Sequence, residues 1–538
     1  MAEPVIAADG RPLKASLNRA LRRSKLRAML LIAPLLIFIL LSFVMPIVDM
    51  LFRSVENQIV SETLPRTTVA LGEWDKEGAP EAPVFEALAR DLAVAVERKA
   101  HTRLGSRLNY ELTGVSSLFR KTGRRVDEIG GTVQDAMADN DAIWNERDTF
   151  GTVFGTPEWV TEMAVWTGAI EDGPAPIFAA QSQMTALFPE ATGLYGEYTQ
   201  LMAEKDDNPF GEKDWPIVAH VFAQELAQVT DLSRLSADDQ ALFESARGAL
   251  DGVTLDDPKA VFIDADEDWG GQDVWTTIST YAPVYTDGYF LNSIDLLKGS
   301  DGVEARPDNE KIYVTLFIRT MIMSLTIMGS CILLGYPIAW LLANLKDRTA
   351  NMLMILVLLP FWTSLLVRTS AWKVLLQQQG VVNDVLVWIG LVADDSRLTL
   401  INNQTGTIIA MTHILLPFMI LPMYSVMKTI PPTYLRAAKS LGANDWTAFW
   451  RVYFPQSVPG IGAGSILVFI LSIGYYITPE LVGGTKGVFI SNRIAYHISS
   501  SLNWGLAAAL GTILLVLVLA LYWAYDRIVG IDNVKLGG

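Results

Sequence analysis

The chain has 538 residues, of which 51% are hydrophobic and 19% charged, a composition that is too apolar for an ordinary soluble protein and predicts a membrane protein. Its formal net charge of −16 is unevenly distributed, because residues 53–310 carry −27 (20 Lys and Arg against 47 Asp and Glu) and the rest carries +11. The surplus basic residues flank apolar stretches and form no aromatic-interleaved face, which argues against a nucleic-acid-binding protein.

Six uncharged runs are long enough to cross a bilayer core, which needs about 20 apolar residues in a helix. They are residues 28–48, 320–345, 349–367, 398–427, 452–479 and 498–525. We expect the first run to be a true span, because it is longer than the apolar region of a signal peptide and lacks a small-residue cleavage pattern. The sequence therefore predicts an all-α membrane protein with six transmembrane helices.

Basic residues near the span ends predict the orientation, since short basic loops stay in the cytoplasm. They are Arg11, Lys14, Arg19, Arg22, Arg23, Lys25 and Arg27 before the first span, then Lys346, Arg348, Lys428, Arg436, Lys439, Arg451, Arg527 and Lys535. Both termini are then cytoplasmic. The expected parts are a basic tail (1–27), the first span (28–52), a periplasmic insert (53–310), a five-helix core (311–530) and a cytoplasmic tail (531–538).

The acidic insert is expected to fold, because it contains seven of the 15 tryptophans and is too aromatic for a disordered linker. The amphipathic run from Pro83 to Ala100 predicts a helix, and turn residues cluster at 206–215 and 251–258. We expect a mainly helical unit, with α+β as the alternative. A folded unit of 258 residues beside the pathway, rich in tryptophan, suggests that it contacts a partner; its acidity could equally serve solubility alone.

The segment between the fourth and fifth spans reads PPTYLRAAKSLGANDWTAFWRVYFPQSVPGIGAG from Pro431. Helical spacing joins Tyr434, Ala437, Ala438 and Leu441, and then Trp446, Phe449, Trp450 and Tyr453. Gly442 is expected to end the first helix, Asn444 or Asp445 to cap the second, and Pro455 and Pro459 to break it. The pattern predicts two short helices at an angle, within a coupling loop at 431–455.

This segment resembles the EAA loop of ABC-importer permeases, which docks into a groove of the ATPase subunit. The matching residues are Arg436, Ala437, Ala438, Gly442, Ala443, Phe454, Pro455, Pro459, Gly460 and Ile461, with Arg436 where the family usually has Glu. Two amphipathic helices resting on the bilayer are the alternative reading. LLGYPIAWLLAN from Leu333, LPFWTSLLVRTSAW from Leu359, LLPFMILPMYSVM from Leu415 and YITPELVGG from Tyr476 resemble the spermidine/putrescine branch.

The resemblance implies a permease subunit of an ATP-driven importer for polyamines or related small organic amines, in a bacterial inner membrane. It implies a second permease, ABC ATPase subunits that hold ATP and Mg, and a periplasmic substrate-binding protein. The sequence has no GxxxxGK[ST] loop, and His101, His220, His413 and His497 lack metal-ligand spacing, so we expect neither an enzyme nor a bound cofactor or metal. The alternative is a membrane sensor whose insert binds a ligand.

Polar and aromatic residues at span edges are candidates for the substrate pathway, because ionisable groups near the membrane are often functional. The candidates are Trp362, Thr363, Arg368, Thr369, Trp372, Tyr476 and Glu480. An aromatic belt with a snorkelling arginine explains the first five equally well. Glu480 either attracts a cation or marks the solvated end of its span.

Overall fold

The computed structural model describes residues 13–166, 173–211, 215–299 and 302–529. Arg11, Lys535 and the tail 531–538, which entered the orientation argument, lie outside them. The chain forms two compact units. The membrane unit comprises Met1–Val55, Ser293–Asp295 and Pro307–Gly538, and the insert unit comprises Glu56–Asn292 and Leu296–Arg306.

The described residues of the membrane unit form helices joined by turns and loops, with no strand among them, which confirms the predicted helical class. Its principal helices are α1 (Leu13–Ile39), α2 (Met45–Arg53), α18 (Tyr313–Asn344), α19 (Asp347–Leu358), α20 (Leu365–Leu375), α21 (Val381–Trp388), α22 (Gln404–Thr429), α25 (Phe454–Gly474), α28 (Ile490–Ser499) and α29 (Trp504–Val529). Short helices are α23 (Pro432–Ser440), α24 (Asp445–Ala448), α26 (Ile477–Val482) and α27 (Gly484–Gly487). In the described part of the chain, five helices suit a membrane span by length and composition, or six if one bent pair is a single span.

The bent pair corrects the third predicted span, because residues 349–367 do not form one straight helix. The segments Asp347–Trp362 and Leu365–Leu375 meet at 93°. Pro360 begins a tight turn, and Thr363 then adopts an extended backbone (ψ 145°) that interrupts the helix. An uncharged run fulfils the length criterion for a span but does not determine whether its backbone stays helical.

Other predicted span ends also move. The fourth span begins at Gln404 rather than at residue 398, because the Asn403 side chain caps α22 by accepting from the N–H of Gly406 at 3.0 Å. The fifth ends at Gly474, and the sixth begins at Trp504. The excluded residues are uncharged, but they include polar side chains and form short helices, turns or extended segments.

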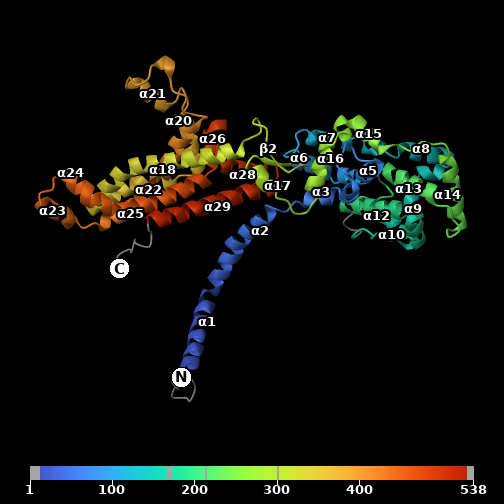
Figure 1. Ribbon diagram of the computed structural model, residues 1–538, viewed down its shortest axis with the longest axis horizontal. Coiled ribbons are helices and arrows are strands. Elements are labelled where there is room, and N and C mark those ends of the chain that lie inside the picture. The colour runs from blue at the N-terminus through green and yellow to red at the C-terminus, as the bar shows by residue number, and fades with distance from the viewer. Residues whose placement is uncertain (1–12, 167–172, 212–214, 300–301, 530–538) are drawn as a thin grey trace. The chain divides into compact units, whose positions relative to one another are not determined.

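Helices α18, α22 and α25 pack side by side as the centre of the membrane unit (Figure 1). Glycines allow this close packing: a Cβ on Gly460 would lie 3.0 Å from the Met423 backbone, and one on Gly464 would lie 2.7 Å from Met419 Sδ. The hydroxyl of Ser472 donates to Ser324 across the α25 and α18 contact at 3.1 Å. By contrast, none of the apolar window of the first span is buried.

The described residues of the insert unit form helices, two isolated bridges and one hairpin. The α+β alternative therefore reduces to two short strands, β1 (Leu296–Gly299) and β2 (Gly302–Ala305), paired with Leu296 opposite Ala305. Its longer helices are α5 (Ala82–Glu97), α12 (Pro189–Glu204), α13 (Pro216–Gln228) and α14 (Ala237–Leu250). Shorter ones are α3 (Gln58–Thr63), α4 (Pro65–Ala70), α6 (Ala100–Leu108), α7 (Val115–Gly123), α8 (Gly131–Asn140), α9 (Thr149–Phe154), α10 (Pro157–Val165), α11 (Ser182–Leu187), α15 (Pro258–Ala265), α16 (Asp273–Tyr281) and α17 (Gly288–Ser293).

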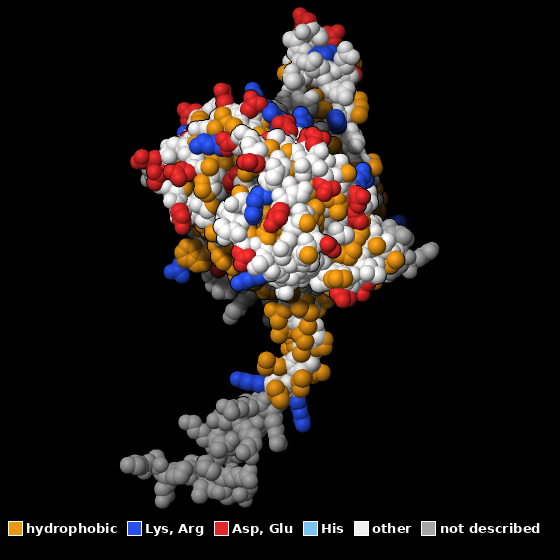
Figure 2. Space-filling view, turned by 90° about the vertical axis from the view of Figure 1, so that its right-hand side faces the viewer, with side chains coloured by type: hydrophobic (Ala, Val, Ile, Leu, Met, Phe, Trp, Pro, Cys, Tyr) orange, Lys and Arg blue, Asp and Glu red, His pale blue; other side chains and the backbone are white. Residues whose placement is uncertain are grey.

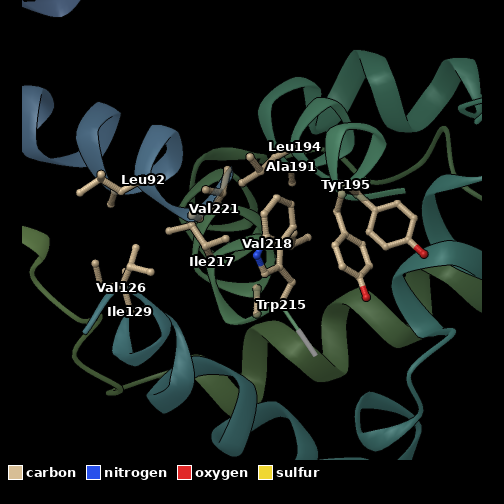
Figure 3. Packing of buried hydrophobic residues seen from close by; sticks show 14 of the residues in the cluster. Leu92, Val126, Ile129, Ala191, Leu194, Tyr195, Trp215, Ile217, Val218 and Val221 are labelled. Carbon is tan, nitrogen blue, oxygen red and sulfur yellow. The ribbon is translucent and has the colours of Figure 1, made fainter. Parts of the chain in front are cut away.

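An aromatic-rich core holds the insert unit together. Figure 3 shows Ala191 and Leu194 of α12 beside Val218 and Val221 of α13. Six of the seven insert tryptophans are buried, and Trp74 is half-buried. The tryptophans therefore stabilise the fold and do not supply a docking surface, which corrects one argument for partner contact. Figure 2 shows acidic side chains spread over the exterior, among fewer basic ones.

Candidate functional site

The coupling segment, which we define as residues 431–455, begins where two prolines separate α22 from α23. Gly442 ends α23 with φ +93°, a left-handed conformation that favours glycine. Its N–H donates to the Lys439 carbonyl at 3.0 Å, and the N–H of Ala443 donates to the Ala438 carbonyl at 3.1 Å. These two bonds form a Schellman cap, so the structure confirms that Gly442 ends this helix.

Asn444 starts the next helix, which decides between the two predicted caps. Its side-chain oxygen accepts from the N–H of Thr447 at 2.8 Å. The predicted break at Pro455 and Pro459 is wrong, because α24 continues through a π-helical turn (Phe449–Tyr453) into α25. Pro455 lies in the first turn of α25, where proline is tolerated, and Pro459 lies inside the helix. The second half of the coupling segment is therefore the start of a continuous helix, Asp445–Gly474.

The coupling segment exposes both apolar and cationic side chains. No residue of α23 is buried, Leu441 is 90% exposed and Trp446 is 72% exposed. Lys439 pairs with Asp445 across the cap. Arg436 is exposed and forms no ion pair with any residue that the structure describes. The segment therefore offers an apolar surface with a free positive charge beside it.

Three of the pathway candidates lie together on α20. The Thr369 hydroxyl lies 3.1 Å from that of Thr478 in α26, and Trp372 Nε1 donates to His413 Nδ1 in α22 at 3.1 Å. The Nε of Arg368 is buried and has no hydrogen-bond partner in the described structure. These contacts hold the bent segment against two other helices, and His413 accepts an interhelical hydrogen bond.

Trp362 and Thr363 do not join this cluster. Trp362 is 71% exposed, and the Thr363 hydroxyl donates to the Pro360 carbonyl at 2.9 Å within the turn before α20. Figure 1 shows α20 and α21 leading away from the bundle of α18, α22 and α25. The structure therefore assigns these two residues to the bend itself.

Tyr476 and Glu480 line a separate cavity of about 560 Å³ between α26 and α28. Asn492 Nδ2 donates to Glu480 Oε2 at 2.6 Å and to the Tyr476 carbonyl at 2.9 Å. The guanidinium of Arg493 lies 5.6 Å from the ring centre of Tyr496 in the same lining. Sequence reasoning missed Asn492, because a neutral residue outside the recognised motifs carries no signal until the fold brings it to Glu480.

The described residues contain no group of three or more His, Cys, Asp or Glu side chains arranged to hold a metal ion. Several apolar helices that pack closely through glycines, with a capped helix exposed between two of them, are typical of a multi-pass membrane protein. Residues 335–529 match the model of the binding-protein-dependent transport system inner membrane component.

Several curated permeases are similar to this chain. PotB, the spermidine/putrescine transport system permease protein of Salmonella typhimurium, is 34% identical over 222 residues, which cover 41% of this chain and 77% of PotB. The Haemophilus influenzae PotB is 36% identical over 197 residues, covering 37% and 68%. The inner membrane ABC transporter permease protein YdcU of Escherichia coli is 33% identical over 225 residues, covering 40% and 71%. The chain belongs to this family of inner-membrane transport components and is a permease subunit of an ABC importer.

Solved structures that match part of this chain include a bacterial ABC transporter involved in the import of the acidic polysaccharide alginate. It is 23% identical, with a TM-score of 0.33, and the match covers 41% of this chain and 83% of that one. The MetNI methionine ABC transporter is 19% identical, with a TM-score of 0.31, covering 40% and 94%.

Proposed function

We propose that this permease imports polyamines or related small organic amines, delivered by a periplasmic binding protein and driven by ATP hydrolysis in a separate subunit. The match to the PotB proteins over 222 residues is the observation that carries the substrate class. The decisive experiment reconstitutes the transporter in vesicles and titrates its binding protein with putrescine, spermidine and quaternary amines. Recognition of a sugar or an inorganic anion instead would exclude the proposed substrate.

The coupling segment is the proposed contact with the ATPase, which would hold ATP and Mg. Its capped helix, its exposed Leu441 and its position between two spans support this role. A second permease subunit completes the proposed pathway. Purification from native membranes tests the assembly, because an ATPase should co-purify with an importer permease but not with a membrane sensor whose insert binds a ligand.

The proposed pathway passes the α20 cluster and the Glu480 cavity. Glu480 forms no ion pair with the described residues, so its carboxylate is available to a cation, and aromatic rings such as Tyr476 and Tyr496 can attract the same charge. Arg368 and Arg493 would oppose a second cation close by. The negative charge of Glu480 and the positive charges of the two arginines then alternate along the proposed pathway. A substrate with separated ammonium groups suits this arrangement of charges better than one with a single compact charge.

We also propose that the insert unit faces the periplasm and that both termini are cytoplasmic. Cys331 is buried and is the single cysteine of the chain, so a Cys331→Ser background permits site-specific labelling. A cysteine at Glu162 in the insert should react with an impermeant maleimide from outside, and one at Lys439 should react only after permeabilisation. The reverse pattern would overturn the topology.

We further propose that the insert unit contacts the binding protein. The charge of −27 on residues 53–310 supports this proposal. Electrostatic docking should weaken as salt rises, since the Debye length is about 8 Å at physiological ionic strength. Replacing residues 60–305 with a Gly/Ser linker should raise the binding-protein concentration needed for half-maximal transport. Unchanged half-saturation with normal expression would eliminate this role.

A further inference from the structure

A groove of about 1110 Å³ opens on the insert unit between α4, α5, α12 and α13. It lies outside residues 335–529, which carry the family match, so the relatives assign it no role. Its charged lining consists of Arg66, Glu86, Arg90, Glu190 and Glu197. Three carboxylates against two guanidinium groups leave the groove with a negative formal charge.

The two arginines are already engaged by the carboxylates of α12. Arg66 pairs with Glu197, and Arg90 Nη1 lies 3.0 Å from Glu190 Oε2. Arg90 Nη2 also donates to Gln224 Oε1 in α13 at 3.2 Å. These bonds connect α4 and α5 to α12 and α13 and fix the positions of Glu190 and Glu197.

Glu86 differs from the other two carboxylates, because it pairs with no lysine or arginine in the described structure. Its Oε2 lies 3.2 Å from Nε2 of His220, a side chain with no exposed surface, and its own side chain is 23% exposed. The other imidazole nitrogen, Nδ1, is buried without a hydrogen-bond partner. Glu86 therefore has a buried polar group beneath it and an open side toward the groove.

The remaining lining suits an aliphatic chain. Val69, Pro83, Ala87 and Leu255 provide apolar walls beside Glu86, and Gln228 adds an amide at the rim. Glu190 and Glu197 are two helical turns apart on one face of α12, which places them roughly 10.5 Å apart along the axis. This spacing is comparable to the length of an extended triamine, whose ammonium groups donate several hydrogen bonds each and bind carboxylates best.

We propose that this groove is a binding site for an aliphatic diamine or polyamine. One ammonium lies on Glu86, the methylene chain crosses Pro83 and Ala87, and a second ammonium reaches the carboxylate of Glu197 in α12. The site is separate from the proposed pathway in the membrane unit, and binding to it requires neither ATP nor a binding protein.

The test uses the purified full-length chain in lipid nanodiscs, without partner subunits, and calorimetric titration with spermidine, putrescine and butylamine. Spermidine should bind, and butylamine should bind at least about tenfold more weakly, because it lacks the second charge-assisted contact. Glu86→Gln should weaken spermidine binding by about tenfold. Glu162→Gln removes the same charge from an exposed position on α10, outside the groove, and should change nothing.

Equal losses from Glu86→Gln and Glu162→Gln would show a diffuse charge effect and overturn the site, as would the absence of spermidine binding to the wild-type chain. Thermal unfolding followed by tryptophan fluorescence checks the fold of each variant. If Glu86→Gln unfolds, Glu197→Gln carries the same test. Spermidine binding that survives Glu86→Gln but disappears in Glu480→Gln would place the amine in the membrane unit and refute the groove as its site. A failure of polyamine transport would refute the proposed function but would leave binding to the groove unaffected.

Discussion

The left-handed cap at Gly442 permits a graded test of the coupling segment. Any added Cβ at this residue meets no heavy atom within 4 Å, so the cost of a substitution comes from the backbone and not from a clash within the chain. Holding a non-glycine residue in this conformation costs about 1 to 3 kcal/mol. Relaxing it instead breaks the bonds at 3.0 and 3.1 Å that close the cap, at about 0.5 to 1.5 kcal/mol each.

Both estimates predict that Gly442→Val reduces the docking-competent population by roughly 5- to 150-fold. Transport and substrate-stimulated ATP hydrolysis in reconstituted vesicles should fall together, with normal membrane insertion. Gly442→Asn should retain most activity, because asparagine tolerates the left-handed conformation. Gly329→Val is the matched control, since that glycine also has open space but has no positive φ. Full activity of Gly442→Val, or equal damage from Asn and Val, would refute the backbone argument.

If the partner groove is acidic, Arg436→Glu should lower the affinity for the ATPase by about tenfold, and Arg436→Gln should lower it by less. Pull-down at two salt concentrations measures this affinity, and tighter binding of the Glu variant would contradict the prediction. Glu480→Gln should reduce the efficiency of diamine uptake by roughly tenfold. Asp395 is an exposed carboxylate, and Asp395→Asn should leave the uptake unchanged. Equal uptake by the two variants would exclude Glu480 from the pathway. Burial raises the pKa of Asp91 and of Glu225, so the stability that they contribute is complete below about pH 4 and is lost as pH rises through their folded pKa values. The unfolding temperature of the insert, followed by tryptophan fluorescence, should therefore fall as pH rises from about 4 through these folded pKa values, and Asp91→Asn should reduce that fall. An unchanged fall in the Asp91→Asn variant would contradict this assignment.

The sequence by itself determined the features that depend on neighbouring residues. The helical class follows from long apolar runs and from helical spacing, and the end of α23 follows from a glycine whose cap joins residues only five positions apart, Ala438 and Ala443. The match of the coupling segment to the EAA pattern was visible for the same reason. The fold class and the family were therefore predictable before any tertiary contact was known.

Tertiary structure decided what depends on distant partners. The bend before α20 accompanies the packing of Thr369 on Thr478 and of Trp372 on His413, residues that lie 109 and 41 positions away. The buried tryptophans entered the core because complementary aromatic surfaces from other helices cover them. Arg90 reaches Glu190 over 100 residues of chain. No local pattern in the sequence contains such pairings, because burial and charge pairing are set by which surfaces the folded backbone brings into contact.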